Sequence, residues 1–253
     1  MTAESLSADL ADKPAVLTAL AERFPRWDPY AALPALLEDE PAAVRLLGLG
    51  AARHVCETAA ARLRRAGVAA SAEHASSAEE PPAGPETLVV GVSLGGGQRE
   101  LCTALDRYVA RSPVIVLTPD PDAVVTKLAD LVVPLHAGTE SAGLGCRAFQ
   151  HAVALTLLLG HRLGAPVSGS SRNFPGLLHR AANATRALLA EAPRWVPAAA
   201  RAWTPRTVCT WWLRRSGCRR RGRGFGCCAA ARCGRRTRSR PESGRTPTGS
   251  WRR

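Results

Sequence analysis

The sequence predicts an α/β fold of three layers, α/β/α, with a parallel β-sheet between helices. Two observations lead to this prediction. Short, nearly continuous apolar runs, typical of buried parallel strands, alternate with stretches of helical apolar spacing, and short loops join them. Two of these runs, which end near residues 50 and 92, lead through glycine-rich turns into a helix. Strands that alternate with helices in this way pair in parallel, with helices on both faces of the sheet.

The individual elements follow from the spacing of apolar residues along the chain. Two N-terminal helices are expected over residues 4–23 and 29–40, and Pro41 ends the second. The predicted strands cover residues 44–50, 68–70, 87–92, 113–117 and 129–135. The predicted later helices cover residues 51–65, 98–110, 145–163 and 174–192. A further short helix is expected after the proline turn at residues 118–122.

This organisation divides the chain into four predicted parts. They are N-terminal helices over residues 1–40, the α/β domain over 41–166, a linker helix within 167–205 and a disordered basic tail over 206–253. The first 205 residues are long enough to bury the core of a full domain.

The net charge of +13 is unevenly distributed along the sequence. Residues 206–253 contain 15 Arg and a single acid, Glu242, so the tail has a net charge of +14 and residues 1–205 have a net charge of −1. A strongly basic chain is typical of nucleic-acid binders. Here the predicted domain is nearly neutral, so a nucleic-acid-binding function would belong to the tail alone.

The composition also bears on the compartment. No apolar run approaches the ~20 residues that a membrane helix needs, so we expect no membrane partner. The N-terminus shows no basic segment followed by an apolar stretch, so no signal peptide is expected. The first 205 residues contain three separated cysteines, Cys56, Cys102 and Cys146, which fits a reducing compartment. The expected location is the cytoplasm.

Two strand ends have the composition of anion-binding turns. Gly48 and Gly50 follow one predicted strand, and the segment Ser93–Gly97 follows another. A glycine-rich turn that leads into a helix presents free backbone N–H groups at the positive end of the helix dipole, and both favour a phosphate or a carboxylate. In open α/β sheets, ligands bind beyond the carboxyl ends of the strands.

Cofactor sites of the common nucleotide-binding kinds are not supported. The segment Gly48–Arg53 lacks the third glycine of the dinucleotide fingerprint, and Glu73 is the only acid near the position that would contact a ribose. A kinase-type phosphate loop is excluded because the sequence has no Gly-Lys-Ser or Gly-Lys-Thr. The six histidines show no metal-ligand spacing. We therefore predict neither a cofactor nor a metal.

Four segments together resemble the SIS (sugar isomerase) domain, and most closely the isomerase half of glucosamine-6-phosphate synthase. They are the glycine turn at 46–53, the run Leu88–Gly97, the strand at 113–118 and the segment 136–150. The family's turn after the third strand typically reads Ser-Gln-Ser-Gly-Glu-Thr. Its later segment reads Ala-Gly-Pro-Glu, then five residues, then Thr-Lys-Ala-Phe; here Ala137–Glu140 and Cys146–Phe149 keep that frame. The resemblance covers residues 40–165.

The resemblance implies that a sugar phosphate binds to the glycine turns through hydroxyl and backbone N–H groups. Carried over by position, the predicted ligand-binding residues are Gly50, Ala51, Ala52, Ser93, Gly95, Gly96, Gly97, Gln98 and Glu140. The family's Gln, second Ser, Glu and Thr are replaced here by Leu94, Gly95, Gly97 and Gln98. Because three hydroxyl or amide donors are lost, we expect weaker binding, each charge-assisted hydrogen bond being worth ~1.5–3 kcal/mol. A purely structural glycine turn is the alternative.

Two side chains of the later segment have more than one possible role. Glu140 matches a glutamate that lies near the ligand in the family, but it is also the kind of acid that stabilises a helix N-terminus. Arg147 replaces the family's lysine, and its alternative position is an exposed helix face.

Catalysis would need further groups. Aldose–ketose isomerisation moves a proton between neighbouring carbons and requires a positioned base. In the resembling synthase, the catalytic glutamate, lysine and histidine come from a second SIS domain and the C-terminal tail, for which we find no counterpart here. We therefore expect phosphosugar binding with weak or absent isomerase activity, and no catalytic residue is assigned. The alternative is a non-catalytic SIS module that senses an amino-sugar phosphate. The family's habit of dimerising implies a homodimer.

The tail has two interpretations. Its Arg, Gly, Cys and Trp content is what GC-rich DNA encodes out of frame, which suggests a frameshift that replaced a second SIS domain. Alternatively, residues 206–253 form a genuine basic arm in which Trp211, Trp212 and Trp251 stack on nucleic-acid bases. Its five cysteines form no Cys-x-x-Cys pair, so a zinc site is not expected.

Overall fold

The computed structural model describes residues 2–37, 39–77, 82–95, 97–165 and 173–202. The chain divides into two compact units, Met1–Glu191 and Ala192–Arg253. The first unit contains the sheet, and the described part of the second is one helix, α7 (Ala192–Ala202). None of the described helices is long and apolar enough to cross a membrane.

A parallel five-stranded sheet forms the centre of the first unit, as the sequence predicts. Its strands are β1 (Ala43–Gly48), β2 (Ala70–His74), β3 (Thr87–Val92), β4 (Val114–Thr118) and β5 (Leu131–Pro134). They lie in the order β2-β1-β3-β4-β5, and every pair is parallel. β3 and β4 are buried along their whole length, which explains why they read as continuous apolar runs.

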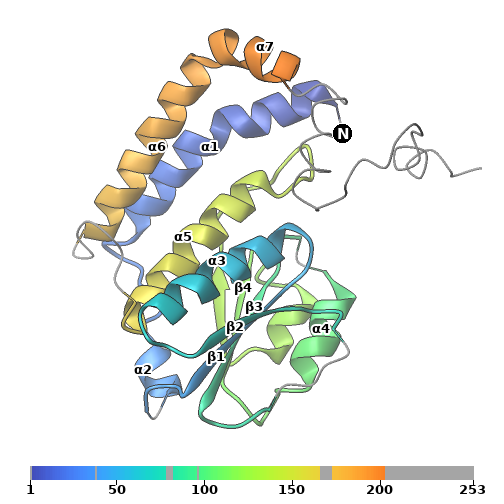
Figure 1. The fold of residues 1–253 in the computed structure, drawn as a ribbon, viewed down its shortest axis with the longest axis vertical. Helices are drawn as coiled ribbons and strands as arrows, with labels where there is room; N and C mark the ends of the chain where they lie inside the picture. Colours follow the sequence, from blue (N-terminus) through green and yellow to red (C-terminus); the bar gives the residue numbers. More distant parts are fainter. Residues whose placement is uncertain (1, 38, 78–81, 96, 166–172, 203–253) are drawn as a thin grey trace, which may run out of the picture. The chain divides into compact units, whose positions relative to one another are not determined.

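Helices cover both faces of the sheet, so the three-layer prediction is confirmed (Figure 1). On one face, α3 (Ala51–Arg65) and α5 (Cys146–Arg162) pack against each other and form the larger core with β-strand side chains such as Leu46, Val90 and Leu117. On the other face, α4 (Arg99–Asp106) and the 3-10 helix η1 (Val124–Leu128) form a smaller core with Val89 and Val116.

Two further helices extend the first face. α1 (Ala3–Arg23) packs along α5 and, on its other side, along α6 (Phe174–Ala190) (Figure 1). α1 begins at a reciprocal capping box between Thr2 and Ser5, which satisfies backbone donors of its first turn. Its buried residues Leu17 and Leu20 join the larger core. The N-terminal helix is thus part of the same compact unit as the sheet.

The second predicted N-terminal helix, over residues 29–40, is wrong in extent. Of the described residues in this range, only α2 (Leu33–Leu36) is helical. No side chain caps its N-terminus, and Leu37 is already extended, with φ −108° and ψ 111°. Pro34 lies in the first turn of α2, where a proline is tolerated, and it disfavours an extension of the helix before Leu33.

Three further differences concern the ends of elements. The second strand is predicted at 68–70 but lies at Ala70–His74, because it is a half-buried edge strand that accommodates polar residues. Its Glu73 accepts a bond from Arg45 of β1 at 3.1 Å. The helix predicted over 98–110 ends at Asp106, and the short helix after the proline turn is η1. A single linker helix is predicted after residue 167, whereas α6 and α7 are two helices. The predicted tail lies outside the described residues, and the predicted domain boundaries stay predictions.

Gly48 permits the close return of the chain from β1 into α3. A Cβ atom at this position would lie 2.9 Å from the carbonyl carbon of Ala52 and 3.0 Å from the backbone nitrogen of Arg53. Neither backbone atom can move without displacing the start of α3. Gly97, in contrast, has open space around the corresponding position and no positive φ.

We therefore expect Gly48→Ala to lower the free energy of unfolding by about 1–3 kcal/mol through overpacking. The matched control Gly97→Ala should change it by less than about 0.5 kcal/mol. Urea unfolding of the two variants measures both values. Equal stabilities of the two variants would contradict the tight β1–α3 connection.

Candidate ligand site at the strand ends

The order of the strands reverses between β1 and β3. From β1 the sheet continues to β2, and from β3 it continues to β4, so the helices that follow these two strands leave onto opposite faces. The last residues of the two strands, Gly48 and Val92, are direct neighbours in the sheet. In open α/β sheets the ligand binds at this switch point, beyond the carboxyl ends of the strands.

The first turn at the switch point leads from β1 into α3. Gly50 is the N-cap residue of α3, with a φ of +54°, and as a glycine it provides no side-chain capping bond. Ala51 is exposed, whereas the side chain of Ala52 is fully buried in the core. The N–H of Ala52 also donates to the carbonyl of Leu49 at 3.0 Å. Gly50 and Ala51 are thus accessible, while Ala52 shapes the turn.

The second turn leads from β3 into α4. Ser93 is fully buried, and its N–H donates to the carbonyl of Leu117 at 2.9 Å. Gly95 and Gly97 are exposed, with open space where a side chain would stand. Gln98 is the N-cap residue of α4 and makes no side-chain capping bond. Of the predicted ligand residues, Gly96 lies outside the described residues.

Glu140 caps the N-terminus of α5. Its Oε2 accepts a hydrogen bond from the N–H of Cys146 at 2.7 Å, and its Oε1 accepts bonds from the N–H groups of Arg147 and Ala148, both at 2.8 Å. The carboxylate therefore occupies the position where a helix N-terminus would bind an external anion. Of the two roles left open by the sequence, the structural one is present, and contact with a ligand stays a prediction.

The start of α5 lies against the second glycine turn. Gly145 adopts the left-handed conformation, with φ +65°, as the residue before α5. A Cβ atom at Gly145 would lie 3.5 Å from the Cβ of Leu94. The structure therefore places the capped end of α5 next to the turn after β3.

Arg147 is not on an exposed helix face, which corrects the alternative position given above. It is 5% exposed, and its guanidinium donates to Asp12 of α1 at 3.1 Å and to the carbonyl of Thr139. It also lies 3.5 Å from the carboxylate of Asp9. Arg147 thus ties the N-terminal helix to the segment before α5.

Asp9 is a buried residue beside the segment of Glu140, and the sequence did not reveal it. It is 2% exposed, and its two carboxylate oxygens accept bonds from the N–H groups of Ser141 at 2.9 Å and Ala142 at 2.7 Å. The backbone donors of Ala142 and Ser141 hold the pKa of Asp9 below its ordinary value, against the opposing effect of burial, and Arg147 adds to the lowering. Its partners lie more than a hundred residues away, so helical spacing alone gives no signal for it.

Two histidines lie close to the carboxyl end of β5. His151 of α5 is fully buried, and its Nδ1 lies 2.7 Å from the carbonyl of Leu135, to which it donates. His136 follows β5 with a positive φ of +51°, a strained conformation for a residue other than glycine, and its ring stands edge-on to Trp27 at 4.7 Å. Burial lowers the pKa of both histidines.

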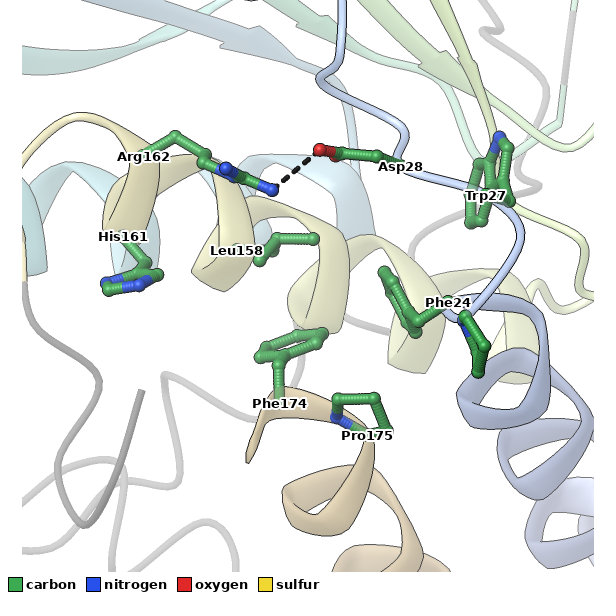
Figure 2. A pocket seen from close by; sticks show the side chains of 9 residues that line it. Phe24, Trp27, Asp28, Leu158, His161, Arg162, Phe174 and Pro175 are labelled. Atoms are coloured by element: carbon green, nitrogen blue, oxygen red, sulfur yellow. Dashed lines mark hydrogen bonds and ion pairs between the residues drawn. The ribbon is translucent and has the colours of Figure 1, made fainter. Parts of the chain in front are cut away.

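A separate aromatic pocket of about 450 Å³ lies where the end of α1, the C-terminal end of α5 and the start of α6 meet (Figure 2). The rings of Phe24 and Phe174 line it and pack edge to face, with their centroids 5.3 Å apart. An ion pair between Arg162 and Asp28, at 2.7 Å, borders it. None of the predicted ligand residues lines this pocket. Among the described residues, no group of three His, Cys, Asp or Glu side chains is placed to hold a metal ion.

The capping role of Glu140 predicts a loss of stability on neutralisation. Glu140→Gln keeps one acceptor oxygen but loses the charge and turns an amide toward backbone donors, so the free energy of unfolding should fall by about 1–3 kcal/mol. Glu57→Gln, at an exposed ion pair on α3, serves as the control and should cost less than about 1 kcal/mol. Urea unfolding checks both, and a Glu140→Gln variant as stable as the control would refute the cap.

The lowered pKa of Asp9 predicts a pH dependence with a definite sign. Because the folded pKa lies below the ordinary value of 3.8, the stabilisation by ionised Asp9 is complete above about pH 4 and is lost as the pH falls through the folded pKa. The stability difference between the wild type and Asp9→Asn should therefore stay constant from about pH 5 to 7 and shrink below 3.8. Thermal unfolding from pH 2.5 to 7 measures it, and a difference independent of pH would contradict the account.

Solved structures with the same architecture include three proteins linked by name to sugar phosphates. The C-terminal domain of glucosamine-fructose-6-phosphate aminotransferase from Francisella tularensis has a TM-score of 0.54 and 15% identity, over 74% of this chain and 55% of that one. A candidate phosphosugar isomerase from Clostridium difficile 630 has a TM-score of 0.59 and 16% identity, over 75% and 55%. A Methanococcus jannaschii protein, for which a function as 3-hexulose-6-phosphate isomerase was inferred, has a TM-score of 0.50 and 16% identity, over 60% and 87%.

At these identities the likeness establishes the fold alone. The chain spans about half the length of the first two of these proteins and most of the length of the third. No curated protein sequence gives a match. The family comparison is more direct, because the model of the SIS domain matches residues 37–163, just over half of the chain. The match spans all five strands and both glycine turns, and so this chain belongs to the SIS-domain family.

Proposed function

We propose that this chain binds a phosphosugar at the switch point between β1 and β3. One observation supports this more than any other. Two glycine turns leave the adjacent ends of Gly48 and Val92. Each turn leads into a helix whose N-cap residue, Gly50 or Gln98, makes no side-chain capping bond in the described part of the chain. Uncapped N-terminal N–H groups and the positive end of the helix dipole together favour a phosphate dianion.

The two turns would share the ligand. Gly50 and Ala51 offer accessible backbone at the start of α3, and Gly95 and Gly97 do the same before α4. The proposal keeps Ser93, Gly96 and Gln98 in the second turn as ligand residues, and Ala52 as a residue that shapes the first. Glu140 would border the site through the start of α5, whose Gly145 lies close to Leu94. In this arrangement backbone groups, rather than side-chain hydroxyls, contribute most of the binding.

The names of the structural relatives support the same ligand class. Sugar phosphates occur in the descriptions of the Francisella, Clostridium and Methanococcus proteins, whose folds this chain shares. A fold hosts many functions, so the ligand class follows mainly from the two glycine turns.

The proposed activity is binding, with weak or absent aldose–ketose isomerisation. A base that moves a proton between carbons must have a free carboxylate or imidazole within reach of the sugar. Glu140, the acid predicted nearest the ligand, already accepts three backbone N–H bonds at the start of α5. This observation favours a sensor or regulatory SIS module for an amino-sugar phosphate over an active isomerase.

The setting of this function is part of the proposal. The cysteines Cys56, Cys102 and Cys146 are all free thiols, in keeping with a cytoplasmic protein. By resemblance to its family, the chain would act as a homodimer. Nucleic acid would be a partner only if the basic tail, residues 206–253, is a genuine arm.

A charge placed in the second turn tests the site directly. Gly95→Asp introduces a carboxylate into open space beside the proposed phosphate, whereas Gly95→Asn introduces a side chain of the same size without charge. Repulsion of like charges should weaken binding of glucosamine 6-phosphate at least tenfold in the aspartate variant relative to the asparagine variant. Isothermal titration of the full chain, with glucose 6-phosphate and fructose 6-phosphate for comparison, measures the affinities.

Unphosphorylated glucosamine provides the control for the phosphate. The proposal expects it to bind at least tenfold more weakly than its phosphate, since the dianion makes the contacts with the turns. Equal affinity of the two Gly95 variants for the sugar phosphate, or no binding of any hexose phosphate by the wild type, would refute the site.

A further inference from the structure

The segment that contains Glu140, residues 136–145, is held by the N-terminal region at two places: at its near end, His136, and towards its far end, at Ser141 and Ala142. We propose that α1 and the turn after it brace this segment, so that Asp9, Arg147 and Trp27 are positioning residues for the ligand site. The inference rests on the proposed function and deepens it, because it adds to the site a helix that lies outside the residues matched by the family model.

Asp9 fixes the far end of the segment. Its carboxylate accepts the N–H groups of two consecutive residues, Ser141 at 2.9 Å and Ala142 at 2.7 Å. Asp9 is 2% exposed, and a buried carboxylate that accepts two backbone N–H bonds fixes the backbone path of Ser141 and Ala142 closely. Asp9 lies on α1, so the loop geometry depends on where that helix is packed.

Arg147 connects this end to α5. The guanidinium is buried between Asp9 and Asp12 of α1 and also donates to the carbonyl of Thr139. Arg147 thereby bonds at once to α1 and to Thr139, the residue before Glu140. The two carboxylates differ in burial: Asp9 is 2% exposed and Asp12 is 61% exposed. Loss of the Asp9 charge would leave the guanidinium of Arg147 buried without its buried partner, whereas the pair with Asp12 is screened by solvent.

Trp27 holds the near end. Its indole meets the ring of His136 edge-on, with ring centroids 4.7 Å apart. His136 is the first residue of the segment and keeps a φ of +51°, which a residue other than glycine holds only where its surroundings enforce it. The contact with Trp27 is such a restraint, and it comes from the residues that follow α1.

The brace would act on the ligand turns through α5. Residues 139–142 set the position of Glu140, and Glu140 in turn bonds the first three N–H groups of α5. Immediately before those residues, Gly145 lies against Leu94 of the second glycine turn. A displaced segment would therefore release the start of α5 and shift the turn that is proposed to hold the phosphate.

Asp9→Asn tests the far end, with Asp12→Asn as the matched control. Asp12 also pairs with Arg147, but its side chain is 61% exposed and receives no backbone bond from the segment in the described residues. We expect Asp9→Asn to accelerate hydrogen exchange of the amides of residues 146–148 at least tenfold, with the amides of β3 unchanged. The affinity for glucosamine 6-phosphate should fall about tenfold. Asp12→Asn should change neither by more than about twofold.

Trp27→Leu tests the near end, with Phe24→Leu as its control. Phe24 contacts Trp27 and Phe174, so its replacement disturbs the same aromatic group without removing the indole from His136. We expect Trp27→Leu to lower the affinity for glucosamine 6-phosphate severalfold and Phe24→Leu to leave it within about twofold. Equal effects of the two substitutions would overturn this half of the brace.

The exchange measurement separates the inference from the proposed function. Hydrogen exchange is measured without ligand. If the wild type binds no phosphosugar, the proposed function is refuted, but the exchange of the amides of residues 146–148 still tests the brace. A uniform rise in exchange that includes β3 would indicate general destabilisation and overturn a positioning role. If Asp9→Asn does not fold, Asp9→Asn combined with Arg147→Met removes both buried charges and restores a folded chain. Wild-type protection of residues 146–148 in that double variant would overturn the inference.

Discussion

The reversal of strand order between β1 and β3 is the constraint on which the proposed site depends. Because β1 and β3 are neighbours and their helices leave onto opposite faces, the two turns that follow these strands separate at one point of the sheet edge. The close return at Gly48 brings α3 back over its own strand at once. Glycine at this position therefore serves the connection itself, while Gly50, Gly95 and Gly97 leave backbone accessible.

The same geometry determines which helix N-termini could bind an external anion. The α-helices α3, α4 and α5 each follow the carboxyl end of a strand, and the chain supplies its own carboxylate to one of them, where Glu140 caps α5. In the described part of the chain, the N-cap residues of α3 and α4 make no side-chain capping bond. An external phosphate would therefore bind at α3 and α4, and not at α5. The buried pair of Asp9 and Arg147 keeps the self-capped helix in place beside them.

Much of this could be predicted from the sequence. Helices such as α3 and α5, and strands such as β3, have strong apolar periodicity or continuous apolar runs, so their positions and the fold class follow from local patterns. The bounds of α2 and β2 could not be predicted in this way. α2 is a single turn with Pro34 near its start, and β2 is an edge strand that contains polar residues. The positions of the glycine turns were predictable because a turn leaves a local mark in the sequence.

The contacts of Asp9 and Arg147 left no such mark. An acid within an amphipathic helix reads as exposed, and only the packing of α1 against α5 brings it to Ser141 and Ala142. The same applies to Trp27 and His136, which lie far apart in sequence. Interactions of this kind are set by tertiary packing, and the family resemblance, which begins after α1, does not include them.

The most direct test of the account is to locate a bound hexose phosphate on the chain by backbone amide chemical shifts in an NMR titration. The account predicts that glucosamine 6-phosphate perturbs the amides of Gly50, Ala51, Gly95 and Gly97 first and most strongly, at the adjacent ends of β1 and β3. Perturbations confined to the aromatic pocket of Figure 2, at Trp27 and Phe174, with the glycine turns unchanged, would contradict it.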